Sequence, residues 1–247
     1  MVNVVSINII GLVDNTYLRP YGSARDIEAL IEDTARYGAY SITINPVFLR
    51  YAREYMARRG YTFKVVAVVD FPFGAGTTES RIDAIKRYSQ YADELDIVAP
   101  IGLVKSRLWG EVEHDINTVV EAAHGYGKII KIIVEDAYTT MEEKLELYRI
   151  VMQSSADFIK TSTGFEDREY AERLGNRAGA QIENVRLMAE LSRKYNPRIG
   201  IKVAGGVRTY QQILEFMRAA ERDPDPMRFR VGTSHLAGII ESMGSAH

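Results

Sequence analysis

Short runs of β-branched residues alternate with amphipathic helical patterns along almost the whole chain of 247 residues. This alternation is typical of βαβ units and of a parallel sheet. The candidate strands end about every 30 residues, roughly the length of a strand, a helix and two short loops. We predict eight strands, at Ser6–Val13, Tyr40–Ile44, Phe63–Asp70, Glu94–Ala99, Lys128–Glu135, Ala156–Thr161, Ile199–Val203 and Arg228–Gly232.

Eight strands interleaved with helices fit a closed barrel better than an open sheet, because none of them leads through a G-x-G-x-x-G turn into a helix. Capping patterns mark helix starts at Ser23–Asp26, Thr140–Glu143 and Thr209–Gln212. No linker divides the chain, and such barrels fill about 250 residues as one unit. We therefore predict an α/β fold, a single-domain (β/α)₈ TIM barrel over 1–247. It carries a charged insertion at about 166–180, a stretch longer than a βα loop needs.

The composition excludes several classes of function. A formal charge of −2, from 31 basic and 33 acidic residues, gives no support for nucleic-acid binding. The chain has no cysteine, which excludes a disulfide framework and a thiolate nucleophile. The apolar run of residues 1–12 is too short to span a membrane and lacks a basic leader, so we predict no membrane association. The absence of cysteine fits a reducing compartment, and we predict a cytoplasmic location. The histidines show no metal-ligand spacing, and we predict no metal; they are His114, His124, His235 and His247.

Two neighbouring predicted strands carry a lysine next to their last residue, Lys160 and Lys202, at the barrel face where active sites lie. Lysine is not the default cation here, because the chain has nine lysines among its 31 basic residues. Two adjacent lysines disfavour each other's charged form, which lowers the pKa of the more buried amine toward the neutral form that attacks a carbonyl. The spacing is equally compatible with two lysines that reach solvent or form internal ion pairs.

Other polar residues also fall on predicted strands. Asp96 could accept or relay a proton, or pair with a core lysine; Glu135 could contribute in the same way, and Lys131 could face the interior. Ala204–Thr209 and Val231–His235 each place glycine and hydroxyl residues between a strand and the next helix. The last two loops of such barrels often hold a phosphate on backbone N–H groups.

The motifs Asp157–Phe165, containing Lys-Thr-Ser-Thr-Gly, and Ile201–Thr209, containing Lys-Val-Ala-Gly-Gly, resemble those of the deoxyribose-phosphate aldolase family. Supporting matches run almost end to end, at Val13–Pro20, Ile44–Pro46, Phe71–Gly74, Glu94–Val98 and Arg230–Ser234. The resemblance implies a class I aldolase that needs no cofactor. It would reversibly cleave 2-deoxy-D-ribose 5-phosphate to acetaldehyde and D-glyceraldehyde 3-phosphate, in deoxyribonucleotide catabolism.

The resemblance also implies roles for individual residues. Lys160 would form the Schiff base, Lys202 would lower its pKa, and Asp96 would relay protons through water. A phosphorylated sugar or aldehyde would be the small-molecule partner, and we expect a homo-oligomer. The residues expected to bind the phosphate are Gly164, Gly205, Gly206, Gly232 and Ser234.

Three features depart from the family pattern. His235 replaces a small hydroxyl residue; it either contacts the phosphate or caps the last helix and leaves the phosphate to backbone amides. The insertion follows the nucleophile strand directly, and the tail Glu241–His247 lacks a tyrosine that some members use in proton transfer. These departures leave two alternatives open: a related class I aldolase for a different phosphorylated sugar, and a non-catalytic barrel that binds a sugar phosphate.

Overall fold

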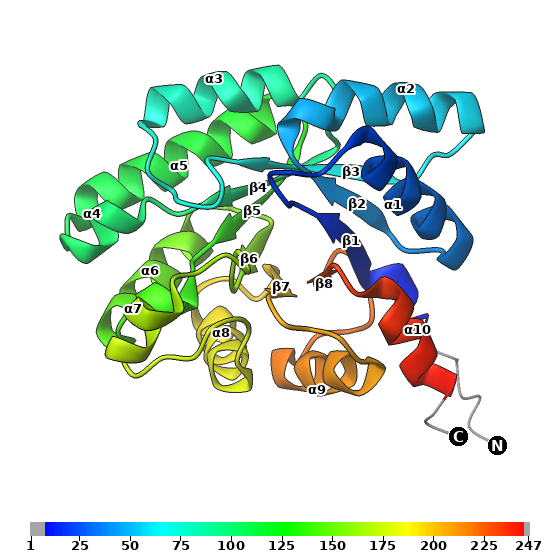
Figure 1. Cartoon of the computed structure of the whole chain (residues 1–247). Coiled ribbons are helices and arrows are strands. Elements are labelled where there is room, and N and C mark those ends of the chain that lie inside the picture. Colours follow the sequence, from blue (N-terminus) through cyan, green and yellow to red (C-terminus); the bar gives the residue numbers. More distant parts are fainter. Residues whose placement is uncertain (1–7, 245–247) are drawn as a thin grey trace.

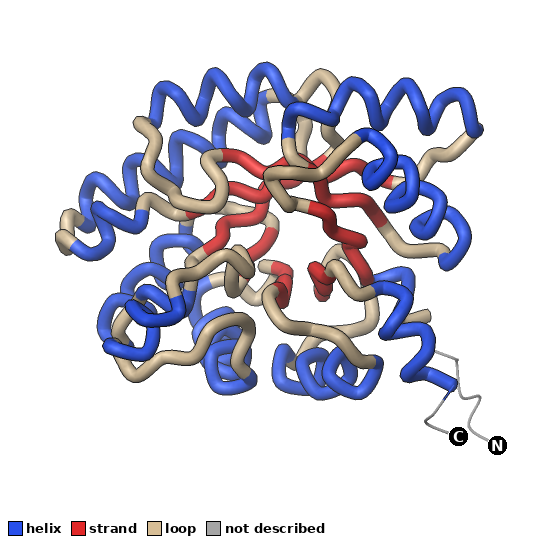
Figure 2. Tube along the Cα trace, in the orientation of Figure 1, coloured by secondary structure: helices blue, strands red, loops and turns tan. Residues whose placement is uncertain are grey.

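The computed structural model describes residues 8–244, in which parallel strands close into one barrel in chain order (Figures 1 and 2). Each strand pairs with the next, and the last pairs with the first. The strands are β1 (Val13–Tyr17), β2 (Ser41–Ile44), β3 (Lys64–Val69), β4 (Glu94–Val98), β5 (Ile129–Ile133), β6 (Phe158–Lys160), β7 (Gly200–Ala204) and β8 (Phe229–Thr233). The predicted (β/α)₈ barrel is thereby confirmed.

Helices follow the strands and form an outer ring around the barrel (Figure 1). The α-helices are α1 (Ala24–Tyr37), α2 (Leu49–Arg59), α3 (Thr78–Tyr88), α4 (Ile101–Lys105), α5 (Trp109–Gly125), α6 (Met141–Gln153), α7 (Arg168–Arg173), α8 (Ile182–Tyr195), α9 (Tyr210–Ala220) and α10 (Leu236–Gly244). Three short 3₁₀ helices complete the set: η1 (Ile10–Leu12), η2 (Pro46–Phe48) and η3 (Asp136–Tyr138). None of the helices in the described range is long and apolar enough to cross a membrane.

The predicted capping boxes are present at the starts of α1, α6 and α9. At Ser23, Thr140 and Thr209 the side chain of the third helical residue accepts the backbone N–H of the capping residue. The cap hydroxyl meets the backbone N–H of that residue in return. These reciprocal bonds satisfy N–H groups that a helix start otherwise leaves without a partner.

The apolar core is a shell between the strands and the helices. Outward-facing strand residues such as Ile97, Ile132 and Val203 belong to one buried cluster with apolar helix residues. Because side chains alternate along a strand, the neighbours of these residues on each strand point into the barrel. There Asp96 stands in register with Lys131, and Lys160 with Lys202. Most barrels of this type fill the interior with branched apolar side chains, so this charged interior sets the chain apart.

The first predicted strand is wrong. Residues 6 and 7 of Ser6–Val13 lie outside the described residues, and Ile10–Leu12 form η1, which packs against β8. The strand instead occupies Val13–Tyr17, where polar residues obscure the usual apolar pattern. Those polar groups find partners far along the chain, as when the Asn15 amide donates to the Thr34 hydroxyl at 3.0 Å.

The segment 166–180 holds the short helix α7 and is fixed at two places. The Asn176 side-chain amide donates to the carbonyl oxygens of Ala137 and Thr139, at 3.1 and 2.9 Å. Further on, the backbone N–H of Ala180 donates to the Gly205 carbonyl at 3.0 Å. The segment therefore joins the loops that follow β5 and β7.

The barrel interior leaves no room for a side chain at Gly200. A Cβ there would lie 2.3 Å from the ring of Phe158, which stands opposite in register and is fully buried. We expect Gly200→Ala to lower the free energy of unfolding by about 1–3 kcal/mol, the usual cost of overpacking a core. Chemical denaturation measures the change. Gly110→Ala is the control, because a Cβ at that site in α5 has no neighbour within 4 Å; equal stability of the two variants would contradict this account.

Candidate active site

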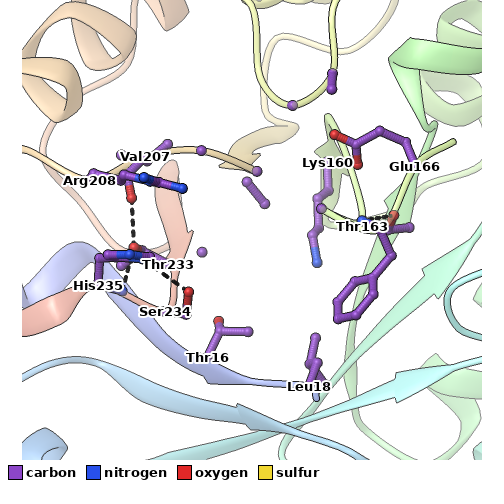
Figure 3. A pocket seen from close by; sticks show the side chains of 18 of the residues that line it. Thr16, Leu18, Lys160, Thr163, Glu166, Val207, Arg208, Thr233, Ser234 and His235 are labelled. Atoms are coloured by element: carbon purple, nitrogen blue, oxygen red, sulfur yellow. Dashed lines mark hydrogen bonds between the residues drawn. The ribbon is translucent and has the colours of Figure 1, made fainter. Parts of the chain in front are cut away.

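A pocket of about 550 Å³ opens at the carboxyl ends of the strands. Lys160, Thr163 and Glu166 lie along one wall, and Ser234 and His235 lie along the opposite wall (Figure 3). The segment 166–180 also contributes to the lining, through residues that include Arg168 and Gly179. The volume of the pocket is in the range of small-molecule binding sites.

The two lysines predicted from the sequence meet beneath this pocket. Lys160 ends β6 and Lys202 stands beside it on β7. Both amines donate to the same carboxylate oxygen of Asp96, Lys160 at 2.8 Å and Lys202 at 2.7 Å. Lys160 lines the pocket, whereas Lys202 and Asp96 do not. Of the three, Lys160 is therefore the one that a substrate can reach.

Below this group, an ion-pair network crosses the barrel interior. Its members are Asp14, Glu94, Asp96, Lys131, Lys160, Lys202 and Arg230, all buried. The ion pairs are Lys160–Asp96 (2.8 Å), Lys202–Asp96 (2.7 Å), Lys202–Asp14 (2.6 Å), Lys131–Asp96 (2.8 Å), Lys131–Glu94 (2.7 Å), Arg230–Glu94 (2.6 Å) and Arg230–Asp14. Burial of charges is costly unless they are paired in this way.

Lys160 is the least compensated cation of this network. Among residues 8–244 it pairs with one carboxylate, whereas Lys131, Lys202 and Arg230 each pair with two. Four cations face three carboxylates, which leaves one positive charge in excess when all are ionised. Loss of the proton from Lys160 removes that excess, because the other cations each lie between two anions.

The pKa of Lys160 is lowered to about 8. Burial is the largest cause, since it penalises the charged amine, and repulsion from Lys202 adds to it, while Asp96 opposes both. For Asp96, burial alone would raise the pKa of the carboxyl, but Lys131, Lys160 and Lys202 hold it well below its usual range. A buried amine with a pKa near neutrality, next to an ionised carboxylate, suits nucleophilic attack on a carbonyl.

The residues predicted to bind phosphate all line the pocket. They are Gly164, Gly205, Gly206, Gly232, Ser234 and His235. Gly205 has a φ of +90° and Gly206 a φ of +82°, conformations that other residues rarely adopt. A Cβ at Gly205 would also lie 2.9 Å from the Cα of Gly179. These glycines are therefore required for the shape of the pocket, whereas their contact with a phosphate stays a prediction.

His235 is exposed at the start of α10, where its Nδ1 lies 3.2 Å from the Ser234 hydroxyl. Its backbone N–H donates to the Thr233 hydroxyl at 3.0 Å. Arg19, Arg168 and Arg208 also line the pocket, although they were not predicted as site residues. In the described range no group of histidines and acidic residues could hold a metal ion, and His124 instead pairs with Asp157 at 3.0 Å.

Asp14, Glu94 and Arg230 belong to the interior network although they were not predicted as site residues. A signal was present, because Glu94 and Asp96 alternate along one strand, as inward-facing residues must. Arg230 likewise interrupts the apolar strand β8. Charged residues two apart on a strand that is otherwise apolar are thus the pattern that predicts such an interior.

The family model described as the DeoC/LacD family aldolase matches residues 9–232. The chain is 45% identical over 238 residues to a deoxyribose-phosphate aldolase of Thermoplasma volcanium, covering 96% of this chain and 95% of the relative. It is 41% identical to one of Pyrobaculum neutrophilum, covering 90% and 95%.

Solved structures have the same fold. An aldolase named QR15 superposes with a TM-score of 0.80 at 27% identity, covering 98% of both chains. A deoxyribose phosphate aldolase from Aeropyrum pernix gives a TM-score of 0.79 at 22% identity, covering 97% of this chain and 92% of that one.

Removing Arg230 tests the interior network. Arg230→Met leaves Asp14 and Glu94 each short of a buried cation, so we expect the free energy of unfolding to fall by about 3–5 kcal/mol. Chemical denaturation at neutral pH measures the loss. Arg50→Met is the control, since Arg50 pairs with Glu54 on the exposed face of α2 and exposed pairs contribute little. Equal stability of the two variants would contradict the importance of the network.

Proposed function

The chain belongs to the DeoC/LacD family of aldolases, and on that premise we propose that it is a class I deoxyribose-phosphate aldolase with Lys160 as its nucleophile. The reaction is the reversible cleavage of 2-deoxy-D-ribose 5-phosphate to D-glyceraldehyde 3-phosphate and acetaldehyde. The observation that carries the proposal is the Lys160 amine, buried at the pocket wall with a pKa of about 8. A barrel that only binds a sugar phosphate would not need this amine to lie beside Asp96 and Lys202.

The chemistry follows from a neutral amine in this position. The Lys160 nitrogen attacks the aldehyde carbon of the open-chain sugar, and loss of water from the carbinolamine leaves an iminium ion. The C3 hydroxyl gives its proton to solvent, and C3 becomes the aldehyde carbon of D-glyceraldehyde 3-phosphate, which leaves. The bond between C2 and C3 breaks, and its electron pair moves towards the iminium nitrogen as an enamine forms. Protonation of the enamine and hydrolysis release acetaldehyde. Because the iminium nitrogen accepts the electrons, the reaction requires neither a metal ion nor an organic cofactor.

Asp96 and Lys202 support this amine. The Asp96 carboxylate accepts from both lysines and from Lys131, so it fixes the position of the Lys160 nitrogen. A carboxylate held so strongly in its ionised form is a weak proton acceptor. Its expected role as a relay through water stays a prediction, and positioning is the role that the contacts support.

The opposite wall supports the binding of a sugar phosphate. Backbone N–H groups around Gly205 and Gly206, together with the Ser234 hydroxyl, offer donors of the kind that hold phosphates. His235 and Arg168 border the same pocket and favour an anionic substrate. His235 and the insertion at about 166–180, which contains Arg168, depart from the family pattern. A related class I aldolase for a different phosphorylated sugar is therefore the alternative, and a panel of pentose and hexose phosphates separates the two. A homo-oligomer and a cytoplasmic location stay predictions.

Trapping the imine tests the nucleophile. With acetaldehyde and borohydride, we expect one stable ethyl adduct on the wild-type protein, mapped to Lys160 by mass spectrometry. Lys160→Ala should form no adduct and lose cleavage activity to near background while it remains folded. An adduct at another lysine, or turnover by the variant close to the wild type, would refute the assignment.

Replacing Lys202 tests its electrostatic effect on Lys160. Lys202→Met removes a repulsive cation and leaves Asp96 free to stabilise the charged amine, so the pKa of Lys160 rises above about 8. Each unit of increase lowers the neutral fraction at pH 7 about tenfold. The ascending limb of the profile of kcat/KM against pH should therefore move to higher pH. A uniform loss at every pH would indicate a role in positioning or proton transfer instead.

A further inference from the structure

Glu135 lies behind the nucleophile strand, and the reaction described above gives it no role. It follows β5, is 1% exposed, and has a φ of +45° that few residues other than glycine adopt. Its Oε2 accepts the backbone N–H of Thr163 at 3.1 Å and also the Thr163 hydroxyl. Thr163 lines the pocket three residues after Lys160. Glu135 thus determines where a pocket residue lies without touching the pocket itself.

Three buried carboxyl oxygens in this region lack hydrogen-bond partners among residues 8–244: Oε1 of Glu135, Oδ2 of Asp136 and Oε2 of Glu166. Glu166 lines the pocket on the same wall as Lys160 and Thr163 (Figure 3). A buried acceptor without a donor is costly. Two carboxylates have no donor to offer each other, whereas a protonated carboxyl can donate to a carboxylate.

We propose that Glu135 is a positioning residue that acts in its protonated form: one proton shared with Glu166 joins the loop after β5 to the segment 166–180 and holds Thr163 against the pocket. The proposal deepens the proposed function and rests on it. Glu135 then uses both oxygens, since Oε2 accepts from Thr163 and the protonated Oε1 donates to Glu166. The shared proton supplies the donor that Oε1 of Glu135 and Oε2 of Glu166 lack.

The surroundings of Glu135 favour the proton. Burial raises the pKa of Glu135 to about 8, and the charges of Glu166 and Asp136 raise it further, while the bonds from Thr163 oppose them. Asp136, also buried, has its own pKa raised to about 7, chiefly by burial. The Tyr138 hydroxyl accepts the backbone N–H of Asp167 at 2.6 Å, and burial together with the charge of Glu135 raises the pKa of Tyr138. Apart from the bonds from Thr163, the leading causes of this pKa shift all disfavour a second negative charge at Glu135.

Ionisation of Glu135 therefore opens this wall of the site. Above about pH 8 two like charges face each other, and they repel the segment 166–180 from the nucleophile strand. The neutral amine of Lys160 accumulates over the same range, so the profile of kcat/KM against pH should have an ascending limb from Lys160 and a descending limb from Glu135. The descending limb falls about tenfold per pH unit where the ionised form is inactive.

Infrared difference spectroscopy of the full chain tests the proton directly and needs no substrate. At pH 7 in D₂O we expect the carbonyl stretch of a protonated carboxyl group in the wild type, and its loss in Glu135→Gln. The Asp136 carboxyl contributes its own band to both proteins, so the difference isolates Glu135. In Glu166→Gln the neighbouring charge is gone, and the Glu135 band should titrate away at a lower pH. Identical spectra of wild type and Glu135→Gln would overturn the proposal.

Kinetics test the consequence for catalysis. A glutamine at 135 accepts from Thr163 and donates to Glu166 at every pH, so Glu135→Gln should lose the descending limb, whereas Glu135→Ala should lower kcat/KM across the whole range. Glu142→Gln, on the exposed end of α6, is the control and should keep the wild-type profile. A descending limb that persists in Glu135→Gln would overturn the proposal. Borohydride trapping at Lys160 in the same variants tests the proposed function separately, because it detects the nucleophile and not the proton on Glu135.

Discussion

The Asp96 carboxylate is the contact on which the rest of the interior depends. One of its oxygens accepts from Lys160 and Lys202 and the other from Lys131, so a single side chain joins β4 to β5, β6 and β7. Through Lys202 and Lys131 the network continues to Asp14 and Glu94. The position of the reactive amine is therefore set by the closed barrel as a whole, because the strands that carry these side chains are fixed by their pairing.

Much of this arrangement could be predicted from the sequence. Short runs of β-branched residues between helical patterns indicated seven of the eight strands to within a few residues. The two lysines fell on the next-to-last predicted residues of neighbouring strands, which brings them together in a parallel barrel. What the sequence could not indicate was the pairing of Arg230 with Asp14, 216 residues apart. For the same reason the polar strand β1 was not predicted, because its stability depends on partners that only the closed barrel supplies.

The contacts of the segment 166–180 could not be predicted from the sequence either. Its charge and length marked it as unusual, but composition cannot show that Asn176 ties it to the backbone after β5 or that Gly179 packs against Gly205. These contacts make the segment part of the pocket wall, next to residues expected to hold phosphate. A change in its length would accordingly alter the shape of the substrate site, even though the nucleophile strand itself would be untouched.

A charged interior also gives the barrel an unusual response to heat. The free energy of hydration of charged groups becomes less favourable as temperature rises, so the cost of keeping seven ionisable side chains away from water decreases. Apolar burial gains no comparable advantage on warming. The layer that is most expensive to assemble in the cold is thus the one whose relative contribution grows at high temperature, and it lies directly beneath the reactive amine.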